Sequence, residues 1–260
     1  MSEIANMNFE EGESHRTWLG ILSELDEMLQ SLNQLKQGLK NFEKYVPAAV
    51  VQHVLRTNKQ VQLGVAPIYA TVMFLDIENF TTITEALQPS DLVNLMQEFF
   101  TNLSQIIIDH SGVIDKYMGD CIMSLFNAPT SVPDHEYQAV CAAMKMHESI
   151  QMLNLQWRDR NFPTIGIRVG INTANCLIGN VGSEQRVNYT ALGDGVNIAS
   201  RLEGLNKYYN TRTMIGPNTY EKVKHLFACR WISSVVLKGK SVATHAYEVM
   251  CSLEDATPEI

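Results

Sequence analysis

The chain has 260 residues, 45% of them apolar, and a formal net charge of −8 at neutral pH. This is the size and composition of one globular domain with an accessory segment. The acidic balance argues against a nucleic-acid partner, because binding a phosphate backbone needs a basic face. The 5 cysteines are widely spaced and include no C-x-x-C pair, which argues against a disulfide framework or a zinc site. No apolar run approaches the ~20 residues that span a bilayer, so we expect a cytoplasmic chain without a membrane span, alone or as the cytoplasmic end of a larger receptor.

The N-terminal part of the chain is expected to be a dimerisation element. Residues 1–15 are polar and predict a flexible tail, and residues 16–63 are expected to form coiled-coil and linker helices. From Leu22 to Val46 the apolar residues recur at spacings of three and four, close to a heptad seam. This pattern favours a parallel two-stranded coiled coil that joins two copies of the chain. The alternative is an amphipathic helix that lies on its own domain.

The main domain is expected over residues 64–252, with a tail over 253–260. Its elements follow the order strand, helix, strand hairpin, helix, strand, which predicts an α+β fold with a ferredoxin-like βαββαβ core and appended β structure. We expect a strand at 70–77, a brief turn, a helix at 89–110, a hairpin at 112–126, a helix at 133–153, strands at 165–171, 176–181 and 187–192, a helix at 195–206, a strand at 211–215, a short helix at 217–226, and strands at 228–237 and 244–250.

This arrangement predicts a metal site formed by two aspartates. Asp76 ends an apolar strand, and Asp120 lies in a Gly-Asp turn between two apolar arms. If the two strands are neighbours, both carboxylates meet at one end of the sheet. Two carboxylates without histidine or cysteine suit Mg²⁺, which completes its coordination with phosphate oxygens and water. The alternative for each aspartate alone is a plain turn or capping residue.

Several basic and amide side chains could hold an anionic substrate. Asn197 and Arg201 lie four apart on one helix face, where they could bind a sugar oxygen and a phosphate, or form an ordinary solvated surface. Lys238 lies in a Lys-Gly-Lys turn, where it could bind a polyphosphate or simply face water. Lys116 and Arg168 interrupt apolar strands and need a partner or a ligand there. Walker A, H-E-x-x-H, G-x-S-x-G and Rossmann patterns are absent, so these motifs give no support to other enzyme classes.

Taken together, these motifs resemble the class III nucleotidyl cyclases, which make cyclic AMP or cyclic GMP. The likeness covers roughly 65–250, in register and in order. The matching segments are FLDIENFT at 74–81, KYMGD at 116–120, RVGINT at 168–173, GNVG at 179–182, GDGVNIASR at 193–201 and LKGK at 237–240.

The resemblance implies a reaction at two metal ions. Asp76, Asp120 and the backbone carbonyl of Ile77 would bind two Mg²⁺ or Mn²⁺ ions. One ion would activate the ribose 3′-hydroxyl for attack on the α-phosphorus, and the other would hold the triphosphate. In this family each site forms between two catalytic domains, so the resemblance implies a homodimer with two equivalent sites.

The resemblance also assigns roles to residues outside the metal site. Asn197 would orient the ribose, and Arg201 would stabilise charge that develops on the α-phosphate. Arg168 and Lys238 would bind the phosphate tail.

Base choice is the remaining inference from the resemblance. Lys116 and Thr190 align with the two positions that select the purine, and an ammonium with a hydroxyl fits the N1 and 6-amino edge of adenine. This favours ATP and an adenylate cyclase regulated through the N-terminal helix, by an upstream sensor domain or a regulatory protein. The alternatives are a guanylate cyclase and a catalytically silent module that binds nucleotide and dimerises. Ala174 departs from a family position that is often glycine, which leaves the shape of an expected phosphate loop open.

Overall fold

The computed structural model of the chain describes residues 26–38, 45, 50–51, 62–236 and 243–256. The chain divides into two units, Met1–Val51 and Gln52–Ile260. In the first unit, residues 26–38 form a helix on which Leu29, Leu32 and Leu35 are exposed. This helix lies within the segment expected to be helical, and the coiled coil stays a prediction. Most of the remaining segment 16–63 lies outside the described residues.

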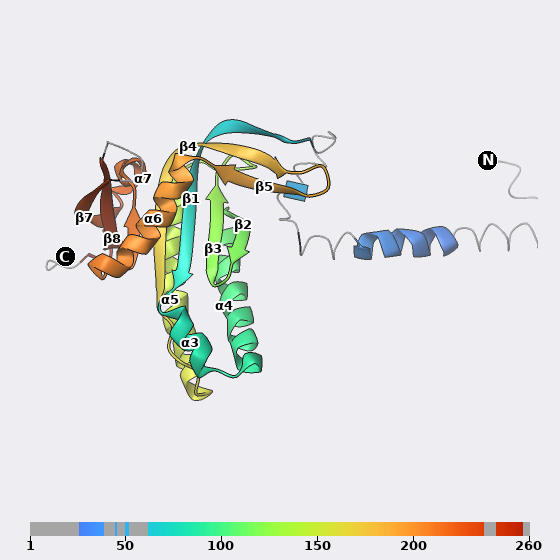
Figure 1. Cartoon of the computed structure of the whole chain (residues 1–260), viewed down its shortest axis with the longest axis horizontal. Coiled ribbons are helices and arrows are strands. Elements are labelled where there is room, and N and C mark those ends of the chain that lie inside the picture. The colour runs from blue at the N-terminus through green and yellow to red at the C-terminus, as the bar shows by residue number, and fades with distance from the viewer. Residues whose placement is uncertain (1–25, 39–44, 46–49, 52–61, 237–242, 257–260) are drawn as a thin grey trace, which may run out of the picture. The chain divides into compact units, whose positions relative to one another are not determined.

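The second unit carries the expected alternation of strands and helices (Figure 1). In chain order these are β1 (Gly64–Ile77), α3 (Phe80–Ala86), α4 (Pro89–Asp109), β2 (Val113–Met118), β3 (Cys121–Phe126), α5 (His135–Asp159), β4 (Ile167–Gly182), β5 (Val187–Leu192), α6 (Asp194–Tyr209), β6 (Thr213–Ile215), α7 (Pro217–Val223), β7 (Phe227–Val236) and β8 (Ala243–Ser252).

The strands of this unit form one sheet in the order β2-β3-β1-β4-β6-β8-β7, and β5 pairs with β4 beside this path. The first four strands with α4 and α5 make the βαββαβ core, in which β1 pairs antiparallel with both β3 and β4. This is the order of a ferredoxin-like sheet. The predicted α+β fold with appended β structure is confirmed.

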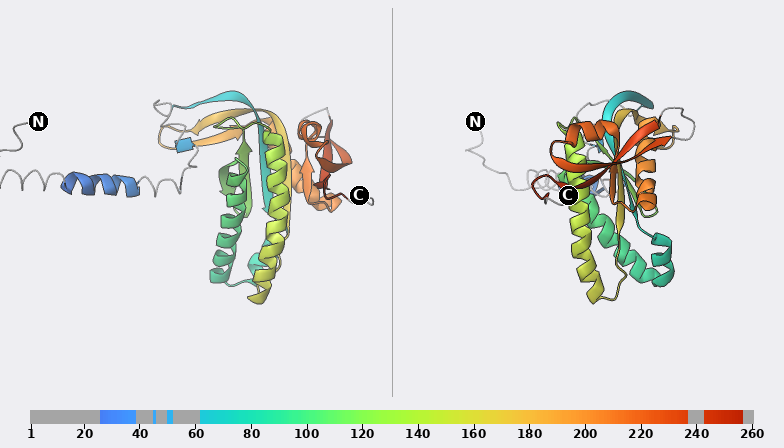
Figure 2. Two further views of the ribbon diagram at one scale, coloured as in Figure 1. Left: turned by 180° about the vertical axis from the view of Figure 1, so that it is seen from behind. Right: turned by 90° about the vertical axis from the view of Figure 1, so that its left-hand side faces the viewer.

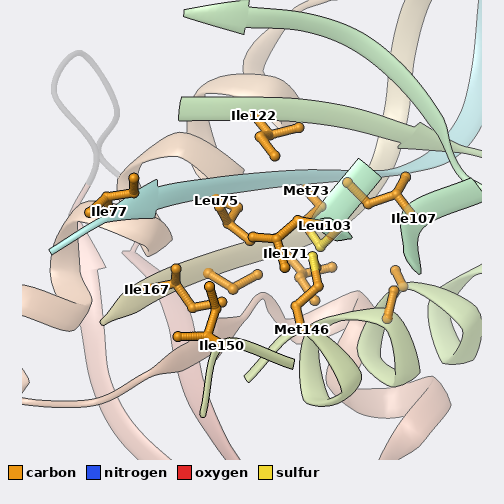
Figure 3. Close-up of a cluster of buried hydrophobic side chains, with 14 of the residues drawn as sticks. Met73, Leu75, Ile77, Leu103, Ile107, Ile122, Met146, Ile150, Ile167 and Ile171 are labelled. Carbon is orange, nitrogen blue, oxygen red and sulfur yellow. The ribbon is translucent and has the colours of Figure 1, made fainter. Parts of the chain in front are cut away.

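Helices cover both faces of the central strands, with α4 and α5 on one face and α6 on the other (Figure 2). Because side chains alternate along a strand, Met73, Leu75 and Ile77 of β1 point into the core under α4 and α5 (Figure 3). Val72 and Phe74 point to the opposite face, where Ala199 of α6 packs in the same cluster. By this alternation the Asp76 side chain lies on the α6 face of β1.

Two parts of the predicted element list are wrong. The segments 165–171 and 176–181 are not separate strands, because β4 runs unbroken from Ile167 to Gly182 and pairs with β1 along this length. Ala174 is therefore a mid-strand residue opposite Ala70 rather than part of a phosphate loop. The segment after Asp76 was expected to be a brief turn, and it contains the short helix α3.

Candidate active site

The end of β1 and the β2–β3 turn bring Asp76 and Asp120 together. Met118 pairs with Cys121, which leaves Gly119 and Asp120 as a two-residue turn. Gly119 has φ +67°, a left-handed conformation that such turns require and that glycine adopts without strain. Since Leu75 pairs with Ile122 on the adjacent strand, the next residue of β1 reaches the turn. The Asp120 carboxyl group is therefore a close electrostatic neighbour of the Asp76 carboxyl group.

The Asp76 carboxyl group lies in an unfavourable environment for a lone negative charge. Burial, followed by the neighbouring Asp120 carboxyl, raises the pKa of Asp76 to about 7. Arg168 opposes this effect, because it faces Asp76 across the β1–β4 pair with Nη2 3.5 Å from Oδ2. One guanidinium is thus shared by a group of acidic side chains.

Glu203 of α6 is the third acidic side chain at this position. Its Oε1 accepts a hydrogen bond of 3.0 Å from the Arg168 Nε, and burial raises the pKa of Glu203 although Arg168 acts in the opposite direction. Gly170 permits this contact. A Cβ on Gly170 would lie 2.1 Å from the Glu203 nitrogen and 2.3 Å from the Ala199 carbonyl oxygen, so α6 packs directly on the β4 backbone.

The residues present fit a site for a hard divalent cation. Asp76 and Asp120 supply carboxylate oxygens, and a cation between them would relieve the repulsion that raises the pKa of Asp76. The Ile77 side chain is buried in the opposite core, so only its backbone can take part. Burial, followed by Asp76, raises the pKa of Cys121 to about 12, so this neighbouring thiol is protonated in the metal-free site. No cluster of three or more His, Cys, Asp or Glu side chains suited to a metal occurs among the described residues, so phosphate oxygens and water would complete the coordination.

A second group of polar side chains lies where β5 meets β2. The Lys116 Nζ donates a hydrogen bond of 3.0 Å to the Thr190 Oγ1, so the two residues expected to read the base are in contact. Thr190 in turn donates a hydrogen bond of 2.5 Å to Oδ2 of Asp115. The Asp115 side chain is 1% exposed, and its Oδ1 lies 3.3 Å from the Lys116 Nζ. Burial raises the pKa of Asp115, and its contacts with Thr190 and Lys116 act in the opposite direction.

The remaining predicted site residues are not joined to the carboxylates within one chain. Asn197 and Arg201 lie one turn apart on α6, and Asn197 is exposed. Across residues 62–236 and 243–256, no hydrogen bond or ion pair of either side chain links it to Asp76 or Asp120. Lys238 falls in 237–242, outside the described residues.

Sequence reasoning missed Asp115, Glu203 and Cys121. Asp115 stands directly before Lys116, but adjacent side chains of a regular strand point to opposite faces, so its position in the sequence did not mark it. Glu203 lies two residues after Arg201 on the same helix, but only its packing on Gly170 reveals that it faces Arg168. Nothing in the sequence marks Cys121 apart from its position after Asp120.

Residues 68–249 match the family model for the adenylate and guanylate cyclase catalytic domain. The chain belongs to this family. The chain is 31% identical to adenylate cyclase 1 of Rhizobium meliloti over 88% of its own length and 34% of the relative. It is also 31% identical to the adenylate cyclase of Anabaena cylindrica, over 88% of its own length and 46% of the relative. The chain thus spans between a third and a half of the length of these relatives.

Solved structures agree with this family membership. The crystal structure of the adenylyl cyclase CyaB from P. aeruginosa matches with a TM-score of 0.68 and 32% identity, over 75% of this chain and 100% of that one. The guanylyl cyclase Cya2 matches with a TM-score of 0.66 and 29% identity, over 75% of this chain and 98% of that one. Both an adenylyl and a guanylyl cyclase are therefore similar to this chain. Within its described part, no helix has the length and apolar character needed to cross a membrane.

Proposed function

We propose that this cyclase converts ATP into 3′,5′-cyclic AMP and pyrophosphate in sites shared by two copies of the chain. The observation that carries the proposal is the Asp76–Asp120 carboxyl pair at the end of β1, with Arg168 beside it. Such a pair suits divalent cations and a polyphosphate substrate. The adenylate cyclases among the relatives support the reaction type.

Asp76, Asp120 and the backbone carbonyl of Ile77 would hold two Mg²⁺ or Mn²⁺ ions. When bound, these ions would lower the pKa of the ribose 3′-hydroxyl and neutralise charge on the triphosphate. The 3′-oxygen would form a bond to the α-phosphorus, and the bond to the bridging oxygen would break, so that pyrophosphate leaves with that oxygen. The protein's own part is to place the reacting groups and to balance their charge.

Arg168 is placed to take over a phosphate of the triphosphate. Its Nε is fixed by Glu203, which leaves the Nη atoms near Asp76 for a second anion. A guanidinium fork held in this way can bind two oxygens of one phosphate. Lys238 would bind the same phosphate tail.

The second copy of the chain would supply Asn197 and Arg201. Asn197 would orient the ribose, and Arg201 would stabilise the charge that develops on the α-phosphate. Both residues lie on α6, and within the described part of the chain neither side chain bonds to the carboxylates of its own copy, which supports a site completed by a second chain. We propose that the helix at 26–38 contributes to this dimer as part of a coiled coil and that an upstream sensor domain or a regulatory protein acts through it.

ATP is favoured over GTP by the contact between Lys116 and Thr190. An ammonium can donate to the N1 of adenine, whereas the N1 of guanine carries a proton and would face another donor. A guanylate cyclase is the alternative, because a guanylyl cyclase is among the similar structures. A chain that binds nucleotide without converting it is the other alternative.

The test is cyclic nucleotide formation by the purified chain with ATP or GTP, each in Mg²⁺ and in Mn²⁺. We expect cyclic AMP from ATP and little cyclic GMP from GTP. Cyclic GMP as the main product would keep the reaction and overturn the base assignment. Binding of nucleotide without any cyclic product would support the silent module.

A further inference from the structure

We infer that Asp115 sets the base preference of this site by fixing the direction of the Thr190 hydroxyl. The inference deepens the proposed function and rests on it, because it concerns the same base-reading position. Asp115 would not touch the base. It would act as a positioning residue that decides which hydrogen-bonding groups Lys116 and Thr190 can offer.

A bulge in β2 brings Asp115 to this position. Ile114 pairs with Ser124 and Lys116 pairs with Met123, so Asp115 is one extra residue on β2. In a regular strand the side chains of neighbouring residues point to opposite faces. The bulge changes this alternation locally, and both Asp115 and Lys116 contact the Thr190 side chain.

The Asp115 carboxylate accepts the only proton that the Thr190 hydroxyl can donate. A hydroxyl has one donor and two acceptor lone pairs, and the Thr190 proton is donated to the Asp115 Oδ2 over 2.5 Å. The same Oδ2 also accepts from the backbone N–H of Ala191 at 3.4 Å, and the Lys116 ammonium lies 3.3 Å from Oδ1. The backbone N–H and the ammonium can only donate, so they favour the ionised carboxylate as the acceptor.

Thr190 is then left with acceptor capacity alone. One lone pair accepts the hydrogen bond of 3.0 Å from the Lys116 Nζ, and the other is available to a ligand. Lys116 has three N–H donors, of which one is directed to Thr190 and one side of the ammonium faces Asp115. The base therefore meets one free donor and one free acceptor.

This pair of groups is complementary to adenine and opposed to guanine. Adenine presents the N1 acceptor and the 6-amino donor, whereas guanine presents the N1–H donor and the O6 acceptor. At position 6, guanine would place its oxygen against a Thr190 oxygen that has no proton to donate. Without the Asp115 carboxylate, Thr190 could turn its proton towards either base, and the discrimination at position 6 would weaken.

The Asp115→Asn variant tests the inference with an isosteric change. The side-chain amide that this substitution introduces can donate to the Thr190 oxygen, which frees the hydroxyl proton for O6. We expect the ratio of kcat/KM for ATP over GTP to fall about tenfold at pH 8, the factor that one net hydrogen bond contributes. A tenfold loss shared equally by ATP and GTP would mean a merely structural role and would overturn the inference.

Two comparisons separate this effect from general damage. Tyr117→Phe removes a β2 side-chain hydrogen bond to Ser104 and should leave the ATP over GTP ratio unchanged. In a Thr190→Val background, Asp115→Asn should not change the ratio further, because the inferred effect on the choice between ATP and GTP passes through the Thr190 hydroxyl. An equal change in both backgrounds would overturn the inference.

An experiment on the unmodified chain covers the case in which Asp115→Asn does not fold. Purine riboside triphosphate keeps the N1 acceptor but lacks the 6-amino donor, so its kcat/KM should be about tenfold below that of ATP. Equal use of both nucleotides would contradict a Thr190 acceptor. If the wild-type chain forms no cyclic product, the proposed function fails. The ratio of the dissociation constants for ATP and GTP, measured by displacement of a bound fluorescent ATP analogue, then still decides the role of Asp115. If the wild-type chain prefers GTP, both the base assignment and this inference fail.

Discussion

The Arg168 guanidinium faces Asp76 across the β1–β4 pair, with 3.5 Å between Nη2 and Oδ2, and the same side chain bonds to Glu203. Arg168 thus lies beside the carboxyl groups of Asp76 and Glu203, and burial together with the nearby Asp120 carboxyl raises the pKa of both. A site with more negative than positive groups gains from a bound divalent cation.

Metal ions should therefore stabilise the free chain before any nucleotide is added. For a ligand at about 100 times its Kd, the gain is about 2.7 kcal/mol, which for a chain of this size corresponds to a rise in Tm of roughly 5 to 10 °C. Asp120→Asn should abolish this rise with Mn²⁺ and leave the metal-free Tm unchanged or higher, because it removes the repulsion on Asp76. Glu85→Gln, an exposed carboxylate on α3, is the control and should keep the full rise. A full Mn²⁺ response in Asp120→Asn would refute the metal site.

Two glycine substitutions, one on β4 and one on α6 where these elements pack together, should have opposite effects on the free energy of unfolding. Gly170→Ala places a Cβ 2.1 Å from the Glu203 nitrogen, so it should lower the free energy of unfolding by about 1–3 kcal/mol or more and displace Glu203 from Arg168. Gly204 lies on α6, and a Cβ added there would have no atom within 4 Å. Gly204→Ala should therefore stabilise the helix by up to about 1 kcal/mol. Urea denaturation measures both, and a neutral Gly170→Ala would show that α6 is not held this closely.

The strand that carries Gly170 shows why part of the fold was predictable and part was not. The apolar runs around Met73 and Ile171 identify buried strands, and the Gly-Asp turn identifies the β2–β3 hairpin. The polar residues Thr173 and Asn175 read as a break in β4. They lie in a continuous strand because β1 pairs with them, and Thr71 bonds to the Thr173 hydroxyl at 2.7 Å. Such a partner is supplied by a segment 102 positions away in the chain, which a local pattern does not contain.

The candidate site, like the fold, was predictable from the sequence only in part. The strand and turn patterns placed Asp76 near Asp120, the family resemblance assigned Lys116 and Thr190 to one base-reading position, and the structure brings the residues of each pair together. Asp115 was not predicted, because on an ordinary strand its side chain would point away from Lys116. Its burial depends on the bulge in β2 and on the arrival of β5, both of which are tertiary features.

Acid should destabilise the domain through His147 of α5. Burial, with a further effect of Arg212, lowers the pKa of His147 to about 4, and its Nε2 lies 2.9 Å from the Thr213 hydroxyl oxygen. Between pH 6.5 and 4 the unfolded chain binds a proton at this residue and the folded chain does not, so stability falls as the pH falls. The loss should reach about 3 kcal/mol near pH 4. His147→Gln should lose this part of the pH dependence in urea titrations at about pH 7, 5.5 and 4, whereas parallel curves for the two proteins would contradict the assignment.

The exposed leucines of the N-terminal helix should support the dimer. Deletion of residues 1–45 should weaken dimerisation and lower activity at low protein concentration. Leu32→Glu with Leu35→Glu should act in the same direction, since both leucines are exposed along the expected seam. Ser31→Glu with Gln34→Glu adds the same charge beside the seam and is the matched control. Unchanged sedimentation and an unchanged rate in the leucine variant would exclude the coiled coil.

The central claim is that one active site uses Asp76 from one chain and Arg201 from its partner, and complementation tests it most directly. Asp76→Ala and Arg201→Ala should each be inactive as homodimers. In an equal mixture, half of the dimers pair the two variants, and one of their two sites has an intact Asp76 and an intact Arg201. The mixture should therefore recover about a quarter of wild-type cyclic AMP formation after subunit exchange. Absence of recovery, with heterodimers shown to form and both variants folded, would contradict a site built from two chains.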